Sequence, residues 1–449
     1  MASSDQSANS MSPAGDFHYD PDVIFGHPDD TTEIDAYDDP VREIAALLHA
    51  AGPVVRGEGL LTERGGAAVR FAGVTFPNIL TPPGYCERGC FCAVSWEAVR
   101  AVYMNPKVFS STVFEESVGA FWGPALSPMD PPEHTKYRSI MQLGFTPKRI
   151  SSYEERIINP IITRRFDAIK HKGKADLVRE LNAFYPFEIV GAIVGFDPSR
   201  IAFVGACFNR IWHANVDPQG AYAAGMALKT YSKNLVESRR GQASKDDLVS
   251  AMMEAEVDGA PLSEERFVAM INHFMAGGID TTYGQSGNLV HTLLSHPEQF
   301  EALKQERSLI PAAIEESLRY EGIGGIVCRR ALEDTSLCGT FIPKGSVVFI
   351  MHGVTDRDPS RWESPDLFNV RRARQPHIQF GSGPHSCIGQ HLARFMLARY
   401  VEHLIDDLPN LRWDPTLETP AKITGWTQRH PVTLPVVWDP DRAAARRSE

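Results

Sequence analysis

The chain has 449 residues, of which 43% are hydrophobic and 22% charged, a composition typical of a globular protein with a large buried core. Its net charge of −11 argues against a nucleic-acid binder, because phosphate binding needs a concentrated basic surface. No stretch approaches the roughly 20 apolar residues that cross a bilayer, and seven cysteines are an odd number that fits a reducing compartment, so we expect a cytoplasmic protein without a membrane span.

The composition along the chain predicts a mobile arm followed by one domain. Residues 1–28 are rich in Ser, Asp, Gly and Pro and lack apolar periodicity, which indicates the arm. No repeat or low-complexity linker divides residues 29–449, so we expect a single domain there. The segment 69–99 mixes β-branched residues with Pro and Gly and predicts short strands, whereas residues 146–404 are mainly helical in pattern. The fold class is therefore mainly α with a small β-rich lobe.

His134 and Arg138, in MDPPEHTKYR, are spaced four apart and would share one face of a helix. Two cationic donors on one face suit a carboxylate. A pair of solvated surface charges is an equally good interpretation of these two residues alone.

A long helix is predicted from an N-cap at Ser263 to about Leu294, with two glutamates in its first turn. Gly277 and Gly278, in AGGIDTT, lie inside it and cost about 1 kcal/mol each relative to alanine. This cost indicates a local purpose, such as a kink beside a binding site. The alternative is a simple packing kink followed by a polar helix face.

Three further segments lie between this helix and the C-terminal region. Glu316 and Arg319, in EESLRY, are three apart and can form an ion pair on one helix face, although an exposed pair of little energy is the alternative. In residues 341–351, FIPKGSVVFIM, a Pro-Lys-Gly turn between two apolar runs predicts a hairpin. Residues 356–376 have no periodicity and predict an ordered surface loop.

Residues 380–389, FGSGPHSCIG, precede a helix-like run and place Cys387 just before a helix N-terminus. Free N–H groups and the helix dipole there should lower the pKa of the thiol, and Gly381 and Gly383 permit tight turns. Gly389 would let backbone N–H groups approach the sulfur. For a cysteine and glycine alone, a buried inert thiol would be the better interpretation.

The longer string F-x-x-G-x-H-x-C-x-G resembles the haem-binding loop of the cytochrome P450 family, and the other motifs occur in family order over residues 134–389. The strings MDPPE, GGIDT, IPAAIEESLR, CIGQHLAR and LPVVWDP further resemble the bacterial camphor-hydroxylase subfamily. The resemblance implies the cytochrome P450 fold, with a long central helix over a buried haem b. It also implies O2 as a co-substrate of a monooxygenase.

On this resemblance, Cys387 is the iron ligand and Phe380 packs beside the macrocycle. Thiolate ligation favours O–O cleavage. The residues implied to bind the haem propionates are His134, Arg138, Arg329 and His385, with Arg330 as the alternative to its neighbour Arg329.

The resemblance also assigns roles around the central helix. Asp280 and Thr281 occupy the acid and alcohol positions of a proton relay. Glu316, Arg319 and Arg371 are implied to form a structural ion-pair network rather than a catalytic group.

The substrate is expected to be a small hydrophobic compound. Where the camphor enzyme has a tyrosine that binds the substrate ketone, the nearest match is Phe121, which favours an apolar terpenoid or aromatic compound. The candidate pocket residues, each of which could equally belong to the core, are Phe114, Phe121, Trp122, Gly277, Ile326, Val327 and Trp426.

The expected partners are a ferredoxin and a ferredoxin reductase, which pass electrons from NAD(P)H to a monomeric enzyme. A basic patch that could dock the acidic ferredoxin comprises Lys136, Arg138, Arg372 and Arg394. Cys86, Cys90 and Cys92 match no common zinc spacing, so no second metal is predicted. Two alternatives stay open, a peroxide-driven peroxygenase and a haem sensor or carrier without turnover, and the Asp280–Thr281 pair argues against both.

Overall fold

The computed structural model describes residues 34, 36–61, 67–77, 86, 88–115, 119, 122–212, 218–243 and 245–440. The predicted arm over residues 1–28 and the candidate Phe121 lie outside these residues. The single domain over residues 29–449 stays a prediction. No helix in the described part of the chain is both long enough and apolar enough to cross a bilayer.

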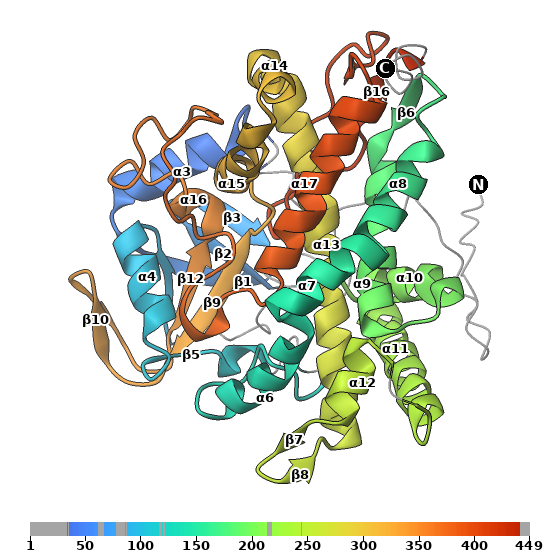
Figure 1. Cartoon of the computed structure of the whole chain (residues 1–449). Coiled ribbons are helices and arrows are strands. Elements are labelled where there is room, and N and C mark those ends of the chain that lie inside the picture. Colours follow the sequence, from blue (N-terminus) through green and yellow to red (C-terminus); the bar gives the residue numbers. More distant parts are fainter. Residues whose placement is uncertain are drawn as a thin grey trace, which may run out of the picture.

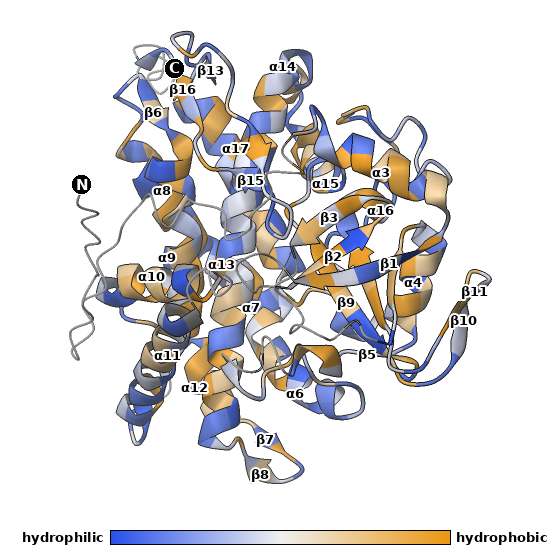
Figure 2. Ribbon diagram, turned by 180° about the vertical axis from the view of Figure 1, so that it is seen from behind, coloured by the Kyte–Doolittle hydropathy of each residue, from blue (hydrophilic) through white to orange (hydrophobic). Residues whose placement is uncertain are grey.

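Helices make up most of the described structure, and the long α13 runs through its middle (Figure 1). They are α3 (Pro40–Ala51), α4 (Trp96–Met104), α6 (Glu133–Gln142), α7 (Pro147–Tyr153), α8 (Asn159–Asp167), α9 (Tyr185–Val194), α10 (Ile201–Trp212), α11 (Pro218–Arg239), α12 (Leu248–Met253), α13 (Glu264–Ser295), α14 (Pro297–Gln305), α15 (Ile310–Tyr320), α16 (His352–Thr355) and α17 (Gln390–Asp407). Figure 2 shows hydrophilic and hydrophobic residues alternating along α8 and α17, as expected for helices that bury one face.

The strands gather mainly on one side of α13, where seven of them form a mixed sheet in the order β3-β2-β1-β4-β12-β9-β5. These strands are β1 (Val54–Leu61), β2 (Ala67–Phe71), β3 (Val74–Pro77), β4 (Cys90–Ala93), β5 (Phe109–Ser110), β9 (Ile326–Ala331) and β12 (Val347–Met351). The smaller sheets contain β6 (Lys174–Asp176), β7 (Glu256–Val257), β8 (Ala260–Pro261), β10 (Thr335–Leu337), β11 (Thr340–Ile342), β13 (Arg412–Trp413), β14 (Ile423–Thr424), β15 (His430–Pro431) and β16 (Pro435–Val437). The mainly helical fold with a small β-rich lobe is confirmed.

The predicted helix at Ser263 is also confirmed, because the Ser263 hydroxyl accepts a hydrogen bond from the Arg266 backbone N–H at 3.3 Å and caps α13. α13 contacts α9, α11, α15 and α17. Being surrounded in this way, it buries residues on most of its faces. It therefore forms the rigid support on which the site is built.

The predicted hairpin over residues 341–351 is wrong. β11 pairs with β10, whereas β12 pairs with β4 in parallel and with β9 in antiparallel register. The Pro-Lys-Gly turn therefore passes the chain from one sheet to another. Local turn chemistry indicated the bend correctly, but the partners of β12 are distant in the sequence. The loop predicted over residues 356–376 is confirmed, since it contains neither helix nor strand.

Candidate functional site

The loop before α17 is a tight turn that presents Cys387. The Cys387 backbone N–H donates to the Phe380 carbonyl at 2.7 Å, which closes the loop. Gly381 and Gly383 have φ of 65° and 67°, in the left-handed region that favours glycine. At Gly383 a Cβ atom would lie 2.4 Å from the Tyr103 carbonyl oxygen, so glycine is required there. The predicted role of these glycines in the turn agrees with this geometry.

The sulfur of Cys387 lies beside the free N-terminus of α17. Burial raises the pKa of the thiol, while hydrogen bonds from the Gly389 and Gln390 N–H groups and the charges of Arg138 and Arg394 lower it. The predicted lowering by the helix N-terminus is therefore present but is outweighed by burial, so the net shift is upward and the prediction is corrected. A thiol in this environment needs a bound cation to stay ionised near neutral pH.

A group of basic side chains lies next to the loop. His134 and Arg138 project from α6, and the Arg138 guanidinium donates to the Ser386 carbonyl at 2.6 Å. The rings of His134 and His385 have centroids 4.0 Å apart. His385 Nε2 also lies 3.1 Å from the Ser111 hydroxyl. These residues come from distant parts of the chain, and the fold brings them together as predicted.

Arg329 joins this group from β9 and is 6% exposed. Its guanidinium donates to the Cys328 carbonyl at 2.7 Å and lies over the rings of Tyr103 and Phe114. Within the described part of the chain, no carboxylate pairs with Arg329 or with Arg138. Two guanidinium groups, one of them buried and the other half-buried, are thus left without an anionic partner.

The electrostatics of this group favour an anion. Burial, with the neighbouring guanidinium charges, lowers the pKa of His134 to about 4 and that of His385 to about 2. The Nδ1 atom of His134 is buried and has no hydrogen-bond partner among the residues that the structure describes. Buried cations and unpaired donors are costly unless an anion satisfies them. The arrangement therefore fits the two carboxylates of the haem that the resemblance implies.

One face of α13 lies across from the cysteine loop. The helix is continuous through Gly277 and Gly278, so the predicted kink is not a break. The Thr281 hydroxyl donates to the Gly277 carbonyl one turn back, at 2.7 Å. A Cβ atom at Gly277 would meet nothing within 4 Å, whereas one at Gly278 would lie 3.1 Å from the Val190 side chain. The two glycines thus differ, one keeping space open and the other letting α9 pack closely.

A cavity of about 230 Å³ separates the cysteine loop from α13. Its lining includes Phe380, His385, Cys387 and Gly389 on the loop side and Gly277, Gly278 and Thr281 on the helix side. His134 and Arg138 reach its edge from α6. Asp280 is half-buried and does not line the cavity, so of the predicted acid and alcohol only the alcohol faces it.

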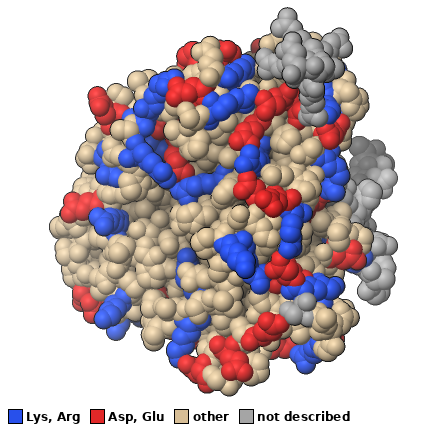
Figure 3. All heavy atoms as spheres, in the orientation of Figure 1, with Lys and Arg blue, Asp and Glu red and all other residues tan. Residues whose placement is uncertain are grey.

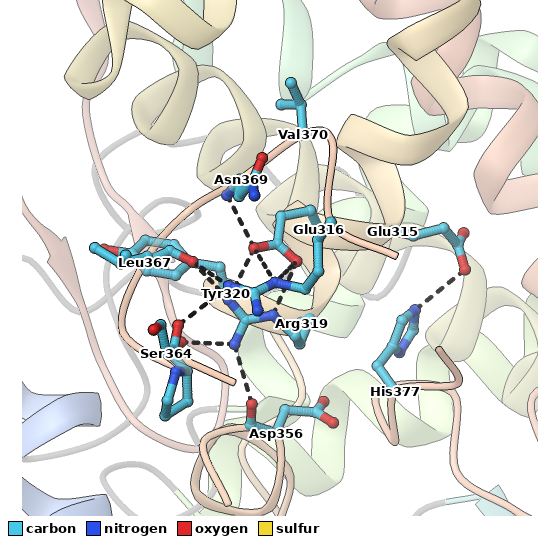
Figure 4. Close-up of polar contacts among 12 residues, drawn as sticks. Glu315, Glu316, Arg319, Tyr320, Asp356, Ser364, Leu367, Asn369, Val370 and His377 are labelled. Atoms are coloured by element: carbon cyan, nitrogen blue, oxygen red, sulfur yellow. Dashed lines mark hydrogen bonds and ion pairs between the residues drawn. The ribbon is translucent and has the colours of Figure 1, made fainter. Parts of the chain in front are cut away.

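The predicted ion pair between Glu316 and Arg319 is a buried, bidentate contact with two distances of 2.9 Å (Figure 4). The third partner is Arg372, whose Nε lies 3.0 Å from Glu316, and not Arg371 as predicted. Arg371 is exposed and pairs with Glu306. The two arginines are adjacent in an irregular loop, where no periodicity tells which one points inward. A cavity of about 380 Å³ borders this network, but its walls contain none of the predicted catalytic or cofactor-binding residues.

Of the predicted pocket residues that the structure describes, only Gly277 lines the cavity. Phe114, Ile326, Val327 and Trp426 instead pack in the core beside the sheet, where Trp426 contacts Phe76. Trp122 is buried behind the cavity against His273. Strand pairing places Ile326 and Val327 of β9 in the lobe, whereas contacts outside the strands place the other three, and neither is visible in the local sequence.

Two polar residues of the cavity, His273 and Ser127, were not predicted. His273 lies four residues before Gly277 and eight before Thr281, so all three share one face of α13. Counting back in steps of four from Thr281 along the predicted helix would have found it. Ser127 lies in an irregular segment before α6, where the sequence carries no such signal.

The predicted basic patch is largely occupied by internal contacts. Arg372 is held by Glu316, and Arg394 pairs with Glu315 at 2.5 and 2.9 Å. Lys136 is exposed and pairs with Asp258, while Arg138 is turned toward Ser386. On the face seen in Figure 3, basic and acidic residues are interleaved. Of the four, Lys136 is the most exposed cation that a partner could reach.

Comparisons with known proteins agree with this geometry. The family model described as Cytochrome P450 matches residues 217–426. The chain is 32% identical to cytochrome P450 monooxygenase PikC of Streptomyces venezuelae over 79% of this chain and 86% of that protein. It is 29% identical to a steroid C26-monooxygenase of Mycolicibacterium smegmatis over 79% and 89% of the two chains. Among solved structures, cytochrome P450 CYP109Q5 from Chondromyces apiculatus aligns with a TM-score of 0.74 and 25% identity over 92% of this chain and 97% of that one.

Proposed function

The chain belongs to the cytochrome P450 family of haem monooxygenases, and we propose that it hydroxylates a small hydrophobic compound with O2 and two electrons from a ferredoxin. The observation that carries this proposal is the placement of Cys387 and Thr281 on opposite walls of one cavity. A metal ligand on one side and a hydroxyl on the other are what oxygen activation between them requires.

The residues present fit haem b. Cys387 would ligate the iron, and Phe380, which lines the cavity under Arg394, would pack beside the macrocycle. His134, Arg138, Arg329 and His385 would bind the propionates, which explains why the two guanidinium groups lack a carboxylate partner. Thiolate-ligated haem, when bound, supplies the activation of O2.

The proton supply falls to Thr281 and Asp280. The Thr281 hydroxyl faces the cavity, and its proton is held by the Gly277 carbonyl at 2.7 Å. Asp280 is adjacent in the chain and outside the cavity lining, and it would pass a proton to that hydroxyl. The hydroxyl would then hold a proton or a water at the reacting oxygen.

The substrate would be a neutral hydrophobic molecule such as a terpenoid or aromatic compound. Apolar side chains around the cavity support this, namely Leu126, Met141, Phe145, Met270 and Phe274. The resemblance of several strings to the camphor-hydroxylase subfamily favours a terpenoid, whereas one relative is named for a steroid. NAD(P)H would act through a ferredoxin reductase, and the enzyme would work as a monomer.

The experiment that tests this function compares two electron sources. The haem-loaded protein is incubated under ¹⁸O2 with tetralin, camphor and 5α-androstane, either with NAD(P)H, ferredoxin and reductase or with H2O2 alone. We expect hydroxylated product that carries one ¹⁸O atom and that requires ferredoxin. Equal or faster product formation with H2O2 alone would instead identify a peroxygenase. Haem binding without product from any source would favour a sensor or carrier.

A further inference from the structure

Ser127 and His273 form a polar pair inside the otherwise apolar part of the cavity. The Ser127 hydroxyl lies 2.7 Å from His273 Nε2, and both side chains line the cavity. Their nearest cavity neighbours in the chain, Leu126, Met270 and Phe274, are apolar. A polar pair in such surroundings costs desolvation, so it stands out from ordinary packing.

The pair is held in one orientation. The Trp122 ring stacks on the His273 ring with centroids 5.7 Å apart and an interplanar angle of 22°. His273 itself is anchored on α13, one turn from Gly277 and two turns from Thr281. The group is therefore rigid and is directed toward the same space that Thr281 faces.

The imidazole is uncharged at neutral pH. Burial lowers the pKa of His273 to about 4, with a further lowering by the charge of His134. A neutral imidazole offers one donor and one acceptor, and a serine hydroxyl offers one donor and two acceptor lone pairs. After bonding each other, the two residues still have one donor and two acceptors left for a ligand. They suit a ketone or hydroxyl oxygen better than a carboxylate, which would need a positive charge.

We propose that Ser127 and His273 bind an uncharged oxygen function of the substrate and thereby select oxygen-bearing ring compounds over their parent hydrocarbons. The inference rests on the proposed monooxygenase function and names its substrate class more closely. His273 and Thr281 are separated by eight residues of helix, a rise of about 12 Å. The bound oxygen and the reacting carbon therefore lie on different parts of the substrate.

The test measures dissociation constants of the haem-loaded protein by calorimetry for three matched pairs. The pairs are tetralone and tetralin, camphor and bornane, and 5α-androstan-17-one and 5α-androstane. Because Ser127 and His273 bond each other without a ligand, a hydrocarbon leaves only their remaining donor and acceptors unpaired, and we expect a preference of roughly tenfold for the ketone in at least one pair. Ser127→Ala and His273→Leu should each bring this ratio close to one.

The matched control is Met270→Leu, which changes an apolar wall of the same cavity and should keep the ketone preference. A merely structural role of the pair would weaken ketone and hydrocarbon alike and leave their ratio unchanged. A wild type without ketone preference in all three pairs, or a preference that survives in both variants, would overturn the inference. The reduced carbon monoxide spectrum separates the two claims: thiolate-ligated haem without ketone preference refutes this inference only, whereas its absence refutes the proposed function as well.

Discussion

Replacement of Arg319 by methionine is expected to lower the free energy of unfolding by about 3–5 kcal/mol, because it leaves a buried carboxylate with one cationic partner fewer. The side chains of Arg319 and Glu316 are 1% and 4% exposed. Arg319 makes two bonds to Glu316 and three to the carbonyls of Asp356, Pro365 and Leu367. All five donors of the guanidinium are used, and methionine satisfies none of these acceptors.

The loop over residues 356–376 depends on this network for its shape. Arg372 bonds both Glu316 and three carbonyls of the loop, and the Asn369 backbone N–H donates to Glu316 at 3.0 Å. We therefore expect Arg319→Met to loosen the loop as well as lower stability, which hydrogen exchange of its amides would detect.

The matched control for this prediction is Arg371→Met. Arg371 is adjacent to Arg372 but 57% exposed, and its pair with Glu306 is on the surface. Such a pair contributes at most about 1 kcal/mol. Urea unfolding of both variants tests this assignment. Similar destabilisation by Arg319→Met and Arg371→Met would contradict the placement of Arg372, rather than Arg371, in the buried network.

The second large effect is expected for substitutions of Thr281 and Asp280 on α13. Thr281→Ala and Asp280→Asn should each lower the rate of product formation by roughly 10²- to 10⁴-fold, the contribution typical of a positioned proton-transfer group. Binding of the substrate should change little, since the hydroxyl is one polar atom on a largely apolar wall. The measurement is kcat and KM for product with the ferredoxin system.

Thr282→Val is the control for this pair, because it removes a hydroxyl from the next residue, which also lines the cavity. Thr282 is 4% exposed, and valine has nearly its shape. Its rate should remain near that of the wild type. A loss at Thr282→Val as large as at Thr281→Ala would show that the wall is merely sensitive to substitution and would refute the relay.

The sequence predicts well those parts of the site whose residues are close together in the chain. Residues 380–389 carry their own turn glycines and the helix start that follows, so loop geometry and the position of Cys387 could be derived locally. His134 with Arg138, and Glu316 with Arg319, follow from helical spacing in the same way. The meeting of His134 and Arg138 with the Cys387 loop around one cavity required the order of motifs of a known family.

The parts that were missed depend on contacts between distant segments. The net rise in the pKa of the Cys387 thiol comes from burial, which local sequence does not show. The pairing of β12 with β9 places Ile326 in the core of the lobe, and a contact with the distant Phe76 places Trp426 there. The choice between Arg371 and Arg372 depends on the path of an irregular loop. In each case the outcome depends on contacts between distant segments, which the periodicity of the local sequence does not show.

The most direct test of the account is the visible spectrum of the dithionite-reduced protein under carbon monoxide. The wild type and a control variant of the exposed Cys338, Cys338→Ala, should both show a Soret band shifted strongly to the red, as expected of thiolate-ligated haem. Cys387→Ala should lack this band. A red-shifted band that survives in Cys387→Ala, or a wild-type spectrum typical of histidine ligation, would contradict the assignment of Cys387 as the iron ligand.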